Sequence, residues 1–165
     1  MEAVRQANET SQIDFDPQRP LTGGVVFATV WIWLANVGVS LASGGLAAAL
    51  ADVNELLDYL ERVQLPVYRP EALYLKGQIL QQQKRPDEAQ GIWQQARTES
   101  EAMGERRMRW RILTGLAEIV GDVQEAAELR QSAREIVAYI AGNAGRPEIR
   151  QSFLNRPDVR RLASD

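Results

Sequence analysis

One helix–turn–helix pattern occurs three times along this chain, and it constrains the fold more than any other feature of the sequence. Its clearest copy spans residues 69–103. In the first half, Leu73, Gly77 and Leu80 recur at i, i+4 and i+7, which predicts an amphipathic helix. That pattern stops before Pro86, because a proline is tolerated only as the opening residue of a new helix. The second half resumes the helical period, so we expect a pair of helices joined by a turn.

Two other segments follow the same plan. The alanine that ends the turn-to-helix segment of the central copy is Ala89, and its counterparts Ala49 and Ala126 lie 40 residues before it and 37 residues after it. The large residue of each first helix keeps nearly the same offset: Trp33, Leu73 and Trp110. Because two independent markers agree in three copies, we expect helical hairpins over about residues 25–63, 70–103 and 106–142.

This pattern resembles the tetratricopeptide repeat, a helix–turn–helix unit of roughly 34 residues. The central copy carries the family's large–small–small–aromatic–small spacing in Leu73, Gly77, Ala89, Trp93 and Ala96. The outer copies depart from it, since Val37 and Thr114 stand where the family prefers glycine or alanine, and Arg130 replaces the aromatic residue. The resemblance implies an all-α fold of antiparallel helical hairpins stacked as a tetratricopeptide-like α-solenoid. A short C-terminal capping helix is expected within residues 147–163.

The resemblance also assigns a set of residues to the core that defines the repeat. Small members let two helices approach closely, and aromatic members fill the remaining space. The set is Trp33, Ala49, Leu73, Gly77, Ala89, Trp93, Ala96, Trp110, Ala126 and Ala133.

Residues 42–162 further resemble the C-terminal helical-repeat region of large bacterial signalling proteins. In those proteins an AAA/STAND-type ATPase, often joined to an adenylate or guanylate cyclase or to a LuxR-type regulator domain, precedes the repeats. The segments that carry the resemblance are Gly77, 85–89, 110–113, 129–130, 133–137 and 153–159. It implies a sensor or scaffold arm that is part of, or derived from, a larger signalling protein. The sequence contains no glycine-rich phosphate loop with its Lys-Ser/Thr, so we expect no nucleotide chemistry and no cofactor.

The partner-binding surface of such a stack is its concave side, which the first helices line. The residues at the family's groove-facing offsets are Trp31 and Leu34, then Tyr74, Gln78 and Gln81, then Arg111 and Glu118. These side chains can hold a peptide through hydrogen bonds and an arginine–carboxylate fork. We therefore predict a protein or peptide partner, and the alternative is that each of them is an ordinary exposed residue.

Several chemistries are excluded by composition. The chain has no histidine and no cysteine, which removes imidazole catalysis, thiolate nucleophiles and the usual transition-metal ligands. Acidic pairs such as Glu125 and Glu128 fall on expected exposed faces, so a carboxylate-only enzyme is the last of our hypotheses, and we expect neither catalysis nor a metal. The net charge of −3 and the glutamates around Arg106–Arg111 also argue against a nucleic-acid partner.

The stretch over residues 20–51 contains no charged residue and allows three interpretations. Leu21–Leu41 is long enough to cross a bilayer, which would make the protein a membrane-tethered adaptor. Tryptophans in mid-run, Asn36 near the centre and the lack of flanking basic clusters favour a buried first hairpin in a cytoplasmic protein. A signal sequence is the third interpretation. An uncovered apolar hairpin would also favour a homo-oligomer. We expect residues 1–20 to be a poorly ordered leader and residues 21–165 to form one domain.

Overall fold

The computed structural model describes residues 23–42 and 44–164, except for the side chains of residues 23–29 and 41. The expected leader over residues 1–20 lies outside this part. The described residues form eight α-helices and one 3-10 turn, with no strand among them. Their bounds are α2 (Gly23–Ala42), α3 (Leu46–Arg62), η1 (Pro66–Tyr68), α4 (Arg69–Gln82), α5 (Pro86–Ala102), α6 (Arg109–Ile119), α7 (Val123–Gly142), α8 (Pro147–Leu154) and α9 (Pro157–Ser164). The prediction of an all-α fold is confirmed.

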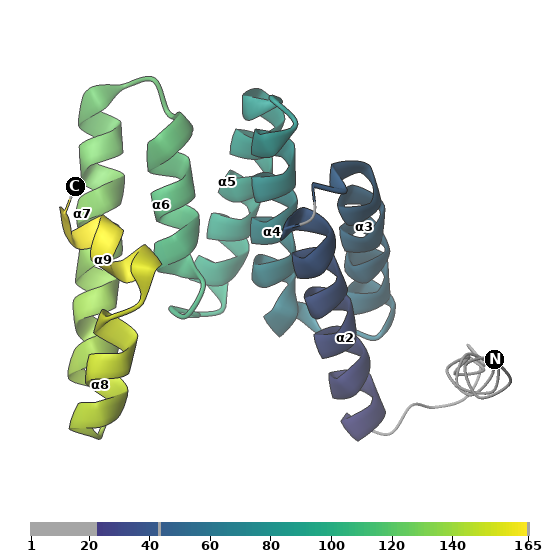
Figure 1. The fold of residues 1–165 in the computed structure, drawn as a ribbon, viewed down its shortest axis with the longest axis horizontal. Coiled ribbons are helices and arrows are strands. Elements are labelled where there is room, and N and C mark those ends of the chain that lie inside the picture. Colours follow the sequence, from purple (N-terminus) through teal and green to yellow (C-terminus); the bar gives the residue numbers. More distant parts are fainter. Residues whose placement is uncertain (1–22, 43, 165) are drawn as a thin grey trace, which may run out of the picture.

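The longer helices pack in chain order. Each of α2 to α6 lies against the next helix, and Figure 1 shows them side by side from the purple α2 to the green α7. The two short yellow helices, α8 and α9, pack against α7 and against each other. Neighbours in sequence are therefore neighbours in space, as the short connections require.

Helix α4 faces an apolar core on each of two sides. Ala72 and Ile79 belong to a core shared with α2 and α3, whereas Leu73 belongs to a second core that continues through α5, α6, α7 and α9. A helix buried on two sides has no single apolar stripe. This explains why small and apolar residues occur around most of α4.

The ends of four helices share one turn geometry at regular intervals. A residue with positive φ follows each of them: Gly44 (78°), Gln64 (54°), Lys84 (62°) and Gly104 (64°). After α4, the Lys84 amide donates to the Gln81 carbonyl at 3.0 Å, and the Arg85 amide donates to the Leu80 carbonyl at 3.0 Å. These two bonds define a Schellman motif, which satisfies carbonyls that the helix end would leave unpaired. The turn therefore recurs every 20 residues, although only two of its four positions are glycine.

The indole of Trp93 joins three helices at the centre of the chain. Trp93 is 1% exposed on α5, and its Nε1 donates a hydrogen bond to the Tyr74 carbonyl oxygen of α4 at 3.0 Å. A Cβ atom added to Gly77 on α4 would overlap this indole, and one added to Gly115 on α6 would lie 3.0 Å from it. The ring therefore occupies space that the missing Cβ of Gly77 leaves free, and Gly115 faces its other side, where an added Cβ would make a tight contact.

We expect Lys84→Gly to raise the free energy of unfolding by about 1 kcal/mol. A non-glycine residue with positive φ costs roughly that much, because its Cβ crowds the backbone, and glycine has no Cβ. Urea denaturation followed by circular dichroism measures the change. Ala127→Gly, on the exposed face of α7, is the matched control and should lose about 1 kcal/mol. A Lys84→Gly protein no more stable than the wild type would contradict the αL assignment.

We expect Gly77→Ala to lower the free energy of unfolding by about 3 kcal/mol, because the new methyl group overlaps the Trp93 ring and forces α4 and α5 apart. Gly91→Ala is the matched control, since Gly91 lies on the exposed face of α5 with nothing within 4 Å of an added Cβ. That substitution should stabilise the protein by about 0.5–1 kcal/mol. Equal effects at the two positions, measured by urea denaturation, would show that the indole does not need the glycine.

Candidate partner-binding surface

The helices that carry the predicted site residues lie next to one another. Helix α4 packs against both α2 and α6, in addition to its partners in chain order. The helices α3, α5 and α7 make no comparable contacts with one another. An open groove of about 540 Å³ instead separates α5 from α7, with Leu113 of α6 and Leu129 of α7 among the residues that line it. The α2, α4 and α6 side is thus the closely packed side of the described chain.

Tyr74 lies at the junction of α4, α5 and α6. Its ring stacks on the Trp93 indole with 6.3 Å between the ring centroids. The pKa of the Tyr74 phenol is raised to about 12, chiefly by burial and also by the negative charges of Glu118 and Asp158. Arg161 opposes them with a smaller effect. Tyr74 therefore lies within the electrostatic reach of one residue of α6 and two residues of α9.

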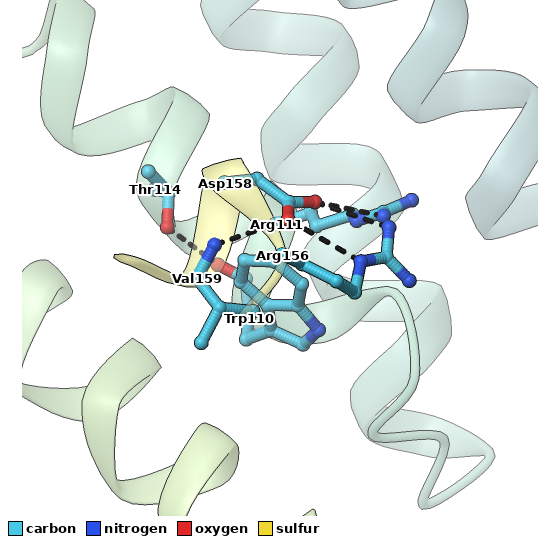
Figure 2. A network of polar contacts seen from close by, with 6 residues as sticks. All are labelled: Trp110, Arg111, Thr114, Arg156, Asp158 and Val159. Atoms are coloured by element: carbon cyan, nitrogen blue, oxygen red, sulfur yellow. Dashed lines mark hydrogen bonds and ion pairs between the residues drawn. The ribbon is translucent and has the colours of Figure 1, made fainter. Parts of the chain in front are cut away.

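Arg111 of α6 holds the carboxylate of Asp158, which is 47 residues away in sequence. Its Nη2 donates to Asp158 Oδ2 at 2.8 Å, and the side chains are 23% and 31% exposed. Figure 2 shows Arg111 from α6 and Arg156 from the α8–α9 connection converging on this one carboxylate. The guanidinium of Arg111 also lies 5.2 Å from the ring centroid of Trp110. A half-buried arginine on an aromatic surface is a favourable receptor for a carboxylate.

The sequence around Asp158 explains its place. Pro157 occupies the first position of α9, where its fixed φ suits a helix start. Asp158 then lies in the first turn, and its Oδ1 accepts a hydrogen bond from the Val159 amide at 3.0 Å. A negative charge is favourable at this end of a helix. One carboxylate thus serves the start of α9 and the arginine of α6 together.

The structure brings some of the predicted site residues together and leaves others apart. Tyr74 and Glu118 share one neighbourhood with Arg111 through the charged groups of α9. Gln78 and Gln81 are partly buried and follow Tyr74 along α4 at i+4 and i+7. Trp31 lies on α2, which packs against α3 and α4, and it is 56% exposed.

One groove-facing expectation is wrong. Leu34 was expected beside Trp31 on the exposed face, but it is 8% exposed and belongs to the core between α2 and α3. The reason is the helical period, because Val30, Leu34 and Val37 form the stripe that packs on α3. The outer face of α2 carries other apolar side chains instead: Trp31, Ile32 and Val39.

The residues assigned to the repeat core are nearly all buried. Trp33 is the exception, since it is only partly buried and packs at the edge of the α2–α3 core. The buried members are Ala49, Leu73, Gly77, Ala89, Trp93, Ala96, Trp110, Ala126 and Ala133. Arg130, which replaces the aromatic residue of the third copy, donates from Nη2 to the Ala117 carbonyl of α6 at 3.2 Å.

Two important residues were missed from the sequence. The sequence singles out no residue of α6 as a partner of Trp93, yet Gly115 faces the indole. A glycine inside a helix, where it is unfavourable, was the available signal. Asp158 was read only as part of the capping segment. Its docking on Arg111 had no local signal, because the two residues are far apart in sequence.

The arginines that precede and open α6 are paired with acidic or aromatic side chains. Arg107 bonds to Glu71 at 2.9 Å, Arg109 bonds to Glu101 at 3.1 Å, and the guanidinium of Arg106 lies 4.5 Å from the ring centroid of Tyr139. The Glu105 carboxylate also accepts bonds from the amides that precede α6. The arginine run therefore forms a largely exposed surface in which each of these three positive charges has a partner side chain.

Three further findings bear on function. Among residues 23–42 and 44–164, no three carboxylates gather as a metal site would require. In the same part of the chain, no helix is both long and apolar enough to cross a membrane, and the proposed span of residues 21–41 begins outside it. Comparisons with protein families, curated proteins and solved structures found no match to this chain.

We expect the stability of the protein to fall between about pH 10 and pH 12 partly because of Tyr74. The folded-state pKa of about 12 exceeds the ordinary value of 10.0, so the unfolded chain loses this proton first and is favoured as the pH rises through that window. The Tyr74 contribution is complete below pH 10. The expected loss is about 2 kcal/mol in wild-type protein.

The Tyr74→Phe variant has no phenol at this position, so its unfolding free energy should decline less over the same window. Urea denaturation at half-unit pH steps measures both proteins. A difference titration of phenolate absorbance, wild type minus Tyr74→Phe, gives the pKa directly, and a midpoint near 10 would contradict the burial of this group.

Proposed function

We propose that this chain is a non-catalytic protein–protein interaction module. In this proposal, antiparallel hairpins α2–α3, α4–α5 and α6–α7 stack as a tetratricopeptide-like α-solenoid, α8 and α9 cap it, and the face formed by α2, α4 and α6 holds a peptide or a partner domain. The recurrent helix-end turns support this arrangement, because a residue with positive φ follows each of the first four long helices, as at the end of a helix in a helical hairpin. A signalling scaffold or sensor arm is the role that such a module would serve.

The packing of alternate helices supports the choice of binding face. First helices that touch while second helices stand apart would curve the solenoid toward the α2, α4 and α6 side. The face on the inner side of that curve is the one that repeat proteins use for partners. It carries Tyr74, Gln78, Gln81 and Arg111, which offer hydrogen-bond donors and an aromatic surface.

The single observation that carries the proposal is the Arg111–Asp158 contact of 2.8 Å. In this contact the guanidinium, which lies on the predicted binding face, donates a hydrogen bond to a carboxylate from a separate segment of the chain. An arginine that binds a carboxylate supplied by its own chain has the geometry to bind one supplied by a partner. The apolar outer face of α2 is the place where a second copy would associate, and oligomer size is therefore recorded in the test below.

We expect a phage-displayed library of random 12-residue peptides, panned on the full-length protein, to enrich sequences with acidic residues. Selected peptides should bind at least tenfold more weakly to Arg111→Ala, because the carboxylate loses its guanidinium. Arg150→Ala, an exposed position on α8, is the matched control and should leave the affinity unchanged. Fluorescence anisotropy measures binding, and light scattering records the oligomeric state.

The proposed function fails if no peptide is enriched over bare beads. It also fails if enriched peptides bind Arg111→Ala, Tyr74→Ala and Gln78→Ala as tightly as the wild type, because the face would then take no part in binding.

A further inference from the structure

Helix α9 depends for its helical conformation on packing against the rest of the protein. It has eight residues, and an isolated helix of that length is marginal in water. Its buried residues are Val159 and Leu162, which are 3% and 2% exposed and belong to the same core as Trp110. Arg134 of α7 adds a bond from its Nε to the Leu162 carbonyl at 3.0 Å. The contacts of α9 with α6 and α7 therefore decide its conformation.

The surface that α9 packs against has one charged contact and one apolar contact. Arg111 binds the carboxylate at the start of the helix, and two apolar side chains, one and four residues later, enter the core beside Trp110. Figure 2 shows Asp158 and Val159 lying over Trp110 and Arg111. An anchoring charge followed by apolar residues on one helical face is how a short helix is recognised in a groove.

The packing of α9 against the rest of the protein is incomplete. An open cleft of about 550 Å³ lies beside it, lined by residues of α7, α8 and α9 that include Val137, Leu154 and Leu162. The side chains of Arg160, Arg161, Ala163 and Ser164 on α9 are exposed. A helix with two buried side chains and one shared carboxylate is held far less firmly than α5, whose Trp93 is packed between two helices.

We propose that the α6 surface around Arg111 is a docking site for a short partner helix that begins with aspartate and carries apolar residues one and four positions after it. In this proposal α9 occupies the site in cis until such a partner displaces it. The inference rests on the proposed function and specifies its ligand: an amphipathic helix with an acidic start, of the same chemistry as residues 157–162. Because α9 is tethered by a short connection, it competes at a high effective concentration, so a partner binds wild-type protein weakly and binds it strongly once α9 is undocked.

The test uses a fluorescein-labelled peptide of residues 155–164 as the probe and the full-length chain as the receptor. The undocked receptor is the double variant Val159→Asp/Leu162→Asp, whose own α9 cannot enter the core. Fluorescence anisotropy should show the probe binding at least tenfold more tightly to the undocked receptor than to the wild type. Circular dichroism and a urea transition check that α2–α7 remain folded.

A charge-deleted probe tests the role of Arg111. The peptide with Asp158→Asn should bind the undocked receptor about fivefold to tenfold more weakly than the wild-type peptide. When Arg111→Ala is added to that receptor, both peptides should bind equally, because the partner of the carboxylate is gone. A probe that ignores Asp158→Asn, or that binds the wild-type and undocked receptors equally, overturns the proposal.

Amide exchange on the wild-type chain keeps the proposal testable if the double variant does not fold. Excess unlabelled peptide should speed exchange at Val159–Leu162 while protecting the site on α6, and unchanged exchange at α9 would overturn displacement. Exchange of α9 between two copies would appear as a dimer by light scattering in the absence of peptide. That result would overturn the assignment of the cis contact.

The two proposals fail in different ways. If library peptides bind the wild type and the undocked receptor equally, the binding function stands and the role of α9 falls. If the α9 probe binds the undocked receptor but the library yields no binder, the cis contact stands as a capping interaction and the partner-binding function falls.

Discussion

The arrangement of the central helices depends on one close approach, the Trp93 indole packed between Gly77 and Gly115. A tryptophan buries a large apolar area, and here the ring fits between the helices because Gly77 has no Cβ and Gly115 leaves space on the other side. The hydrogen bond from its Nε1 to the Tyr74 carbonyl then satisfies the polar atom of the ring. Through this ring α4, α5 and α6 are held in one register. The orientation of Tyr74, and with it the chemistry of the neighbouring surface, follows from that register.

The same packing explains how distant charges come together. Because α4 and α6 are adjacent, the phenol of Tyr74 experiences the fields of Glu118 on α6 and of Asp158 on α9. Because Trp110 is buried beneath this surface, Phe153 of α8 can contact it edge-on at 6.3 Å between centroids. This contact places the C-terminal helices α8 and α9 next to α6, where Asp158 reaches Arg111. The polar site is a product of apolar packing, which is why it includes residues from three parts of the chain.

The helix-end turns show a different relation between sequence and structure. In four of them a residue with positive φ follows the helix, yet Gln64 and Lys84 adopt this conformation without being glycine. Each accepts a local backbone cost because the helices on both sides gain more from packing than the turn loses. The recurrence of the turn every 20 residues could not be read from residue types, because two of its four positions are not glycine. It became visible only through the backbone angles.

Much of the helical content followed from local patterns, whereas the candidate site did not. Proline at 86 and 157, the Asp122 side chain that caps α7, and the small and apolar residues at helical spacing each act within a few positions. The sequence by itself therefore determined the all-α fold and most of the buried residues of the repeat core. The tertiary structure alone decided that Gly115 faces the indole, that Leu34 points into the core, and that Asp158 reaches Arg111. These outcomes depend on the rotation of one helix relative to another and on contacts between residues as many as 47 positions apart, and no local pattern specifies them.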